Sequence, residues 1–160
     1  MPKIAKYALI CAAIGLGLAL SYTLATPPKS APALSFKTIN GQSLSLNQFK
    51  GKPVLITFWA SDCQSCLAEI PDLVTLHQQG LTIIAVAMPY DPPNRVLAIA
   101  TEKQLPYPIA LDPNAEINTG FGGIPYTPTS FLINPQGQII HHHTGKLELP
   151  AVQALLRDMG

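Results

Sequence analysis

The sequence predicts one α/β domain in which helices flank a mixed central sheet. Two uncharged, β-branched runs, VLITFWA (54–60) and LTIIAVAM (81–88), are typical of strands that are buried on both faces. A stretch with helical spacing of apolar residues follows each run. Turn sequences at 40–41 and 134–137 lie between short extended segments and predict two hairpins. This mixture of strand–helix units and hairpins predicts a mixed sheet covered by helices.

An apolar segment precedes the predicted domain. Residues 7–25 carry no charge and are about as long as a helix that crosses a bilayer. Lys3 and Lys6 before the segment, against Lys29 behind it, favour a cytoplasmic N-terminus. A cleaved signal peptide is the alternative. Either way, the rest of the chain would lie in an oxidising compartment such as the periplasm.

The composition agrees with one small domain attached to this segment. The chain has 160 residues, a formal net charge of +1 and 12% charged residues, so it lacks the basic surface of a nucleic-acid-binding protein. We expect residues 1–28 to be a membrane anchor or signal sequence, residues 29–33 to be a proline-containing linker, and residues 34–160 to be the domain.

Local signals define the elements of the domain in chain order. Asn40-Gly41 suits a tight turn, which predicts an N-terminal hairpin extension of the sheet. Gly80 is expected to end the first helix, Pro71 to kink it, and Asn94 to cap the second helix. The expected strands are 34–39, 43–46, 54–60, 81–88, 107–111, 130–133 and 138–142, and the expected helices are 66–79, 95–104 and 149–159.

A C-x-x-C motif follows the first buried strand and is the strongest functional signal. Cys63 is expected at a helix N-terminus, where unpaired N–H groups and the helix dipole stabilise a thiolate. Cys66 lies one turn later on the same face, so the pair could form and break a disulfide. A structural disulfide and a metal site are the alternatives, although the metal site would need two more ligands. The third cysteine, Cys11, is expected to be an apolar residue of the N-terminal segment.

Three segments, FWASDCQSCLAEIP, PYPIALDPNAEINTGFG and YTPTSFLINPQGQI, resemble the TlpA/ResA/DsbE-type thiol-disulfide oxidoreductases of the thioredoxin superfamily. The resemblance begins near Leu34 and implies a thioredoxin-like fold behind a single N-terminal transmembrane helix. It also implies an extracytoplasmic reductase of protein disulfides, such as those of apocytochrome c or of oxidase copper-site assembly factors. We expect an inner-membrane monomer that depends on a membrane thiol donor and has no cofactor besides its redox-active disulfide.

The resemblance assigns roles to the cysteines and to one acidic residue. It implies that Cys63 is the exposed nucleophile and that Cys66 is the buried resolving thiol. Glu69 matches the acid that is proposed to accept a proton from the buried cysteine. Glu69 also lies three residues after Cys66, within contact distance on a helix. An ordinary helix-surface carboxylate is the alternative for Glu69.

The remaining site residues surround the motif. Trp59 is expected to pack against the active-site helix, and Thr127-Pro128 matches the family's cis-proline, which faces a bound polypeptide. Ser65 stands where many relatives have proline, and the two residues between the cysteines tune the stability of the thiolate. Asp62 places a carboxylate beside Cys63, where it would raise the pKa of the thiol and favour reductant behaviour.

Three consecutive histidines suggest a different function. On a strand, His141 and His143 would share one face while His142 points away. A copper-delivery module that uses Cys63, Cys66 and one of these histidines is the alternative function, since thiolates select Cu(I). A solvated strand end is the simpler interpretation of the histidines, and we expect no metal site. The Pro-x-x-x-Thr-x-x-Cys pattern of peroxidases is absent.

Overall fold

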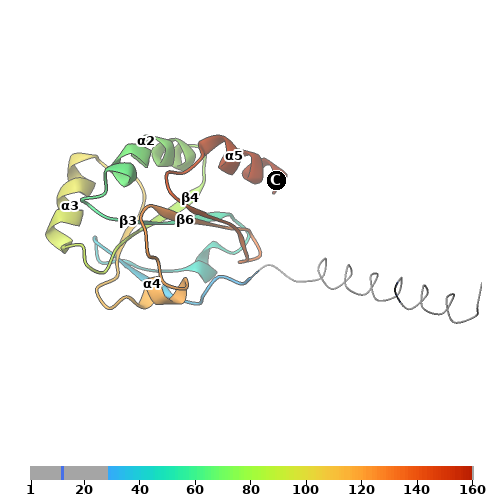
Figure 1. Cartoon of the computed structure of the whole chain (residues 1–160), viewed down its shortest axis with the longest axis horizontal. Helices are drawn as coiled ribbons and strands as arrows, with labels where there is room; N and C mark the ends of the chain where they lie inside the picture. The colour runs from blue at the N-terminus through green and yellow to red at the C-terminus, as the bar shows by residue number, and fades with distance from the viewer. Residues whose placement is uncertain (1–11, 13–28, 160) are drawn as a thin grey trace, which may run out of the picture.

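The computed structural model describes residue 12 and residues 29–159, which include a seven-stranded mixed sheet with helices on both faces (Figure 1). The strand order is β2-β1-β5-β4-β3-β6-β7. The strands are β1 (Ser35–Thr38), β2 (Ser43–Ser45), β3 (Val54–Trp59), β4 (Thr82–Ala87), β5 (Ile109–Leu111), β6 (Thr129–Ile133) and β7 (Ile139–Thr144). The helices are η1 (Leu46–Phe49), α2 (Gln64–Gln78), α3 (Pro93–Glu102), α4 (Glu116–Gly120) and α5 (Leu149–Asp158).

The centre of the sheet is parallel and its edges are antiparallel. β3 pairs with β4, and β4 with β5, in parallel, as their connections through α2 and α3 require. β6 runs antiparallel to β3, with Phe58 opposite Thr129. β7 pairs antiparallel with β6, and these two strands form a hairpin. The predicted N-terminal hairpin is formed by β1 and β2 and extends the sheet beyond β5. The mixed α/β fold class is therefore confirmed.

Two apolar clusters hold the helices on the sheet. One face packs beneath α2, α3 and α5, through residues such as Leu73, Val96 and Val152. The opposite face packs against α4 and the segment after it, through Ile117 and Phe121. Figure 1 shows this layering, with α2, α3 and α5 on one side of the sheet and α4 on the other. The buried strands β3 and β4 thus receive side chains from both layers, as their uncharged sequences predicted.

Local details differ from the predictions. α2 begins at Gln64, two residues before the predicted start, and it runs through Pro71 to Gln78. The prediction that Asn94 caps α3 is wrong, because Pro92 is the N-cap and Pro93 the first helical residue. Proline is favoured in a first helical turn, since its missing N–H would have no partner there. α4 and η1 were not predicted.

The described chain enters the domain along the start of β7. Ala31 N–H donates to the Gly137 carbonyl at 2.9 Å, and Ile139 N–H donates to the Lys29 carbonyl at 2.9 Å. The predicted anchor, residues 1–28, falls outside the described residues apart from residue 12. Within the described part of the chain, no helix combines the length and apolar character that a membrane crossing requires.

Candidate active site

Cys63 and Cys66 form a disulfide at the N-terminus of α2, with an S–S distance of 2.11 Å and a Cα–Cα distance of 5.2 Å. Cys63 is the N-cap of the helix, and Cys66 N–H donates to Cys63 Sγ at 3.2 Å. Ser65 Oγ lies 3.4 Å from the same sulfur. Cys66 is only 2% exposed, whereas Cys63 is half-buried. The helix start therefore offers hydrogen-bond donors to the more accessible sulfur.

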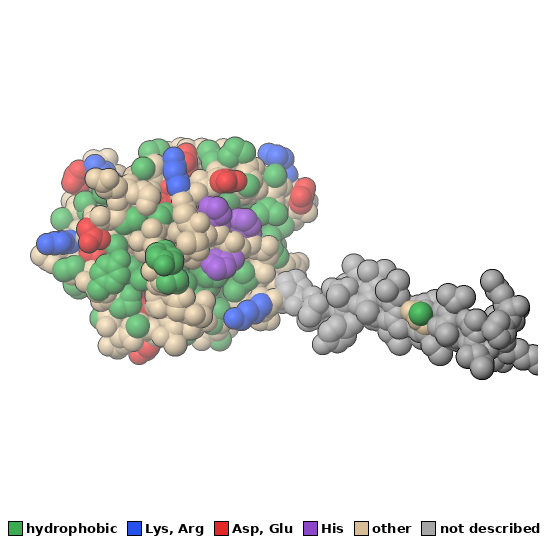
Figure 2. Space-filling view, in the orientation of Figure 1, with side chains coloured by type: hydrophobic (Ala, Val, Ile, Leu, Met, Phe, Trp, Pro, Cys, Tyr) green, Lys and Arg blue, Asp and Glu red, His purple; other side chains and the backbone are tan. Residues whose placement is uncertain are grey.

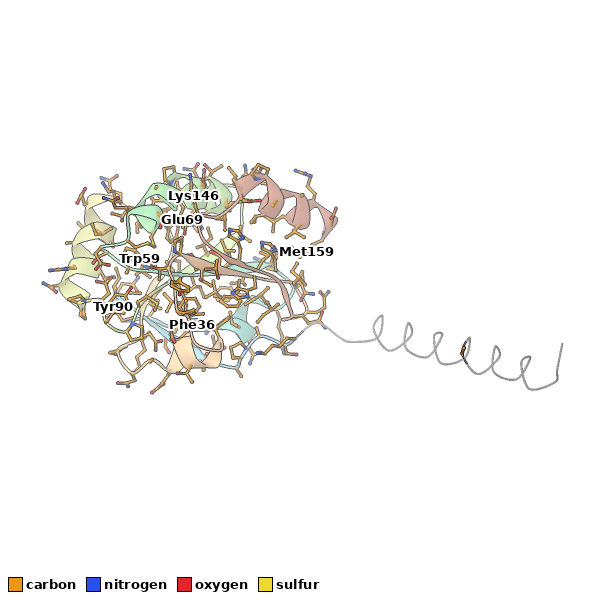
Figure 3. The ribbon with its side chains drawn as sticks, in the orientation of Figure 1. Phe36, Trp59, Glu69, Tyr90, Lys146 and Met159 are labelled. Atoms are coloured by element: carbon orange, nitrogen blue, oxygen red, sulfur yellow. A yellow bond between two sulfur atoms is a disulfide. The ribbon has the colours of Figure 1, made fainter. Side chains whose placement is uncertain are left out.

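Glu69 is a buried carboxyl group on the inner side of α2. Its Oε1 accepts a hydrogen bond from Thr57 Oγ1 at 3.3 Å, and its Oε2 accepts one from Leu147 N–H at 3.0 Å. Burial raises the pKa of Glu69 to about 7, although these hydrogen bonds and the Lys146 ammonium act in the opposite direction. Figure 3 shows Glu69 and Lys146 near each other beside α2. A carboxyl group with this pKa can hold or release a proton near neutral pH.

Glu69 and the buried cysteine of the disulfide line the same small cavity of about 10 Å³. Thr57, Trp59, Cys66, Glu69 and Tyr107 are among the residues that line it. Trp59 is 5% exposed, and its indole Nε1 has no hydrogen-bond partner. The structure thus brings Cys66, Glu69 and Trp59 together around one space. The prediction that Trp59 packs against α2 is consistent with this arrangement.

The Thr127–Pro128 peptide bond is cis, as the resemblance implied. Pro128 is buried and Thr127 is half-buried directly before β6. Because Thr129 pairs with Phe58, this peptide lies at the end of the sheet where β3 leads into the C-x-x-C motif. All the predicted site residues therefore gather at one end of the sheet.

Sequence reasoning missed the partner of the loop that precedes Cys63. Asp91, in the segment after β4, accepts hydrogen bonds from both the backbone N–H and the hydroxyl of Ser61, each at 2.6 Å. Asp91 and Ser61 are 30 residues apart, and no local pattern links them. Only the strand order could have indicated this contact, because the carboxyl ends of adjacent parallel strands lie at the same edge of a sheet.

The histidines lie on the outer strand β7, and Figure 2 shows histidine side chains gathered on one face of the molecule. His141 and His143 stack with their ring centroids 6.1 Å apart, whereas His142 stacks on Phe131 at 4.4 Å. The predicted alternation of the three side chains is therefore confirmed. In the described part of the chain, no group of three or more His, Cys, Asp or Glu side chains is placed to hold a metal ion.

Comparisons with known proteins point to one family. The sequence model of the Redoxin family matches residues 27–156. The chain is 31% identical over 162 residues to the thiol-disulfide oxidoreductase ResA of Bacillus thuringiensis subsp. konkukian, covering 94% of this chain and 91% of that protein. The thioredoxin-like protein YneN of Bacillus subtilis is 32% identical over 124 residues, covering 74% and 72%. Among solved structures, a thiol:disulfide interchange protein of the thioredoxin family from Chlorobium tepidum matches with a TM-score of 0.75 and 26% identity, covering 84% of this chain and 97% of that one.

Proposed function

Because the chain belongs to the Redoxin family and is a TlpA/ResA/DsbE-type thiol-disulfide oxidoreductase, we propose that it reduces disulfide bonds of proteins outside the cytoplasm. The observation that carries this proposal is the unequal exposure of the two sulfur-bearing residues. Cys63 is accessible at a helix N-terminus, while Cys66 is enclosed behind it. This arrangement suits an attacking thiolate and a protected resolving thiol.

The reaction consumes the dithiol form of the pair. The Cys63 thiolate attacks one sulfur of the substrate disulfide, which forms a mixed disulfide and releases the first substrate thiolate. The Cys66 thiolate then attacks Cys63 Sγ, which closes the Cys63–Cys66 disulfide and releases the second thiolate. Two electrons and two protons pass to the substrate. Glu69, close to Cys66 along the cavity wall, is suited to accept the proton of the Cys66 thiol in the second step.

The surface near the disulfide suits a polypeptide substrate. Tyr90, in the segment after β4, is 63% exposed, and Tyr126, just before the cis peptide, is 71% exposed. Figure 3 shows Tyr90 at the periphery of the domain, on the same side as Trp59. Because β3 lies between β4 and β6, these tyrosines lie on either side of the C-x-x-C segment. Exposed tyrosines supply contact area at low entropic cost.

The finer parts of the proposal concern the location and the partners of the protein. Residues 1–28 would anchor a monomeric domain, residues 34–160, to the outer side of the cytoplasmic membrane, with residues 29–33 as the linker. A membrane thiol donor would return the disulfide to the dithiol form, because an oxidising compartment does not do so. Apocytochrome c and assembly factors of oxidase copper sites are the proposed substrates.

Insulin reduction tests the activity. We use a Cys11→Ser background, so that Cys63 and Cys66 are the only thiols of the chain. With dithiothreitol as electron donor, the background protein should reduce insulin faster than dithiothreitol alone, and Cys63→Ser should abolish this gain. Cys66→Ser should still attack but stall as a mixed disulfide. Undiminished turnover by Cys63→Ser would contradict the proposal.

Trapping in the protein's own cells tests the partners. The Cys66→Ser chain should accumulate mixed disulfides with extracytoplasmic proteins, and mass spectrometry identifies them. The double variant that also carries Cys63→Ser is the matched control and should trap none. Tight Cu(I) binding by the reduced chain without disulfide exchange would instead favour the copper-delivery alternative.

A further inference from the structure

Asp91 is a buried carboxylate that the reaction described above does not use. It is 7% exposed, and each of its oxygens accepts one short hydrogen bond, Oδ2 from Ser61 N–H and Oδ1 from Ser61 Oγ, both at 2.6 Å. Hydrogen bonds to an ionised acceptor are stronger than neutral ones. The segment after β4 is thereby fastened to the loop that leads from β3 to the disulfide.

The residues that Asp91 holds belong to the turn that presents Cys63. Cys63 N–H donates to the Ala60 carbonyl at 3.1 Å, which closes a turn with Ser61 and Asp62 at its centre. Asp91 is itself held by a turn, since its N–H donates to the Met88 carbonyl at 2.9 Å. The position of Cys63 at the start of α2 therefore depends on a contact between two short turns.

The charge of Asp91 is poorly screened. Neither ion pair of the described residues involves it, and the first turn of α2 contains no acidic residue. Two other carboxyl groups lie near the disulfide: Asp62, which is exposed, and Glu69, which lies behind Cys66. Water and salt screen an exposed charge much more than a buried one. Asp91 is thus a buried negative charge on the Cys63 side of the site.

We propose that Asp91 is a positioning residue for Cys63: it fixes the turn of residues 60–63 through Ser61, and its charge disfavours the Cys63 thiolate. A less stable thiolate makes the dithiol form less stable relative to the disulfide, so the pair becomes a stronger reductant. This inference concerns the cysteine pair itself and applies to any disulfide substrate. The charge of Asp91 disfavours the Cys63 thiolate, whereas the N-terminus of α2 stabilises it.

Asp91→Asn tests the charge while it preserves the shape. The amide oxygen can still accept from Ser61 N–H, and the amide N–H₂ can donate to Ser61 Oγ. In the Cys11→Ser background, the pKa of Cys63 should fall, as followed by thiolate absorbance. The equilibrium constant for reduction of the disulfide by glutathione should rise about tenfold, which corresponds to a potential about 30 mV less negative. Neither measurement needs a protein substrate, so the role of Asp91 can be correct even if the proteins proposed above are not substrates.

Two further variants separate charge from structure. Ser61→Ala keeps the charge but removes one hydrogen bond from it, so the pKa of Cys63 should stay or rise. Asp62→Asn removes an exposed charge beside Cys63 and should lower the same pKa, but less than Asp91→Asn does. A folded Asp91→Asn protein with unchanged pKa and potential would overturn the proposal. So would a lowered Cys63 pKa in Ser61→Ala, even if Asp91→Asn did not fold.

Discussion

Glu69 links the stability of the folded domain to pH. Its pKa rises from 4.5, the ordinary value, to about 7 because burial disfavours the charged carboxylate. Its contribution to stability is therefore complete below pH 4.5 and is lost as the pH rises through 7. The pKa difference corresponds to about 3 kcal/mol in the free energy of unfolding.

Urea unfolding of the disulfide form between pH 4 and 8 checks this prediction. Relative to Glu69→Gln, which cannot ionise, the unmodified protein should lose about 3 kcal/mol of unfolding free energy across this range. The glutamine can still accept the hydrogen bond from Leu147 N–H, so the comparison isolates the charge. Parallel pH profiles for the two proteins would show that Glu69 does not ionise with the raised pKa.

Single residues were predictable from the sequence where their role depends on near neighbours. The cysteine spacing and the start of a helix are local, so Cys63 and Cys66 were placed correctly. Glu69 was placed near Cys66 from helix geometry, but its hydrogen-bond partners lie 12 and 78 residues away. The contact between Ser61 and Asp91 likewise spans 30 residues. Such partners are set by strand order, which the periodicity of one sequence does not contain.

At the scale of elements, α4 depends on one buried carboxylate. Asp112 is 4% exposed and accepts hydrogen bonds from Ile117 N–H at 3.0 Å and Asn118 N–H at 2.7 Å. Asn118 Oδ1 in turn accepts from Ile124 N–H at 3.3 Å, near the segment that carries the cis peptide. The five-residue helix has too few internal hydrogen bonds to be stable alone. Asp112 therefore fixes both α4 and the chain that follows it.

Asp112→Ala should loosen this region. We expect a loss of about 2 to 4 kcal/mol in unfolding free energy, because two hydrogen bonds to a charged group disappear. Hydrogen exchange should speed up in residues 116–124 and change little in β3 and β4. Asp112→Asn, which keeps one acceptor oxygen, should have an intermediate effect. Uniform acceleration throughout the sheet would instead indicate that Asp112 stabilises the whole domain equally.

Helices and strands were predictable where the signal lies in their own sequence, and they were missed where their support comes from distant residues. β3, β4 and α5 carry their signals within their own sequences, as β-branched runs or as an amphipathic pattern, and were predicted. α4 was missed because its support comes from Asp112, outside the helix. Its N-cap, Ala115, also has a left-handed backbone (φ 57°), which is unusual for alanine.

At the scale of the whole molecule, the chain enters at the end of the sheet opposite the disulfide. β7 pairs its first residue, Ile139, with Ile133 and its last residue, Thr144, with Thr129. Residues 29–31 hydrogen-bond at the beginning of β7, whereas Thr129 lies beside the end of β3 that leads to Cys63. The two ends are separated by the length of the five-residue strand β6, about 15 Å. An anchor attached through Lys29 would therefore leave the cysteines facing away from the point of attachment.

This geometry predicts that the described domain works without the preceding segment. A chain of residues 29–160 should reduce insulin with dithiothreitol at a kcat/KM within about twofold of the full chain, because every contact described around the disulfide comes from residues after 56. A chain of residues 34–160 should keep this activity but lose about 1 to 3 kcal/mol of stability, since it lacks the hydrogen bonds of residues 29–31 with β7 and the turn before it.

Thermal unfolding and insulin turnover of the three chains, each in the Cys11→Ser background where residue 11 is present, separate the two effects. A folded 29–160 chain with strongly reduced turnover would show that the N-terminal segment contributes to catalysis itself.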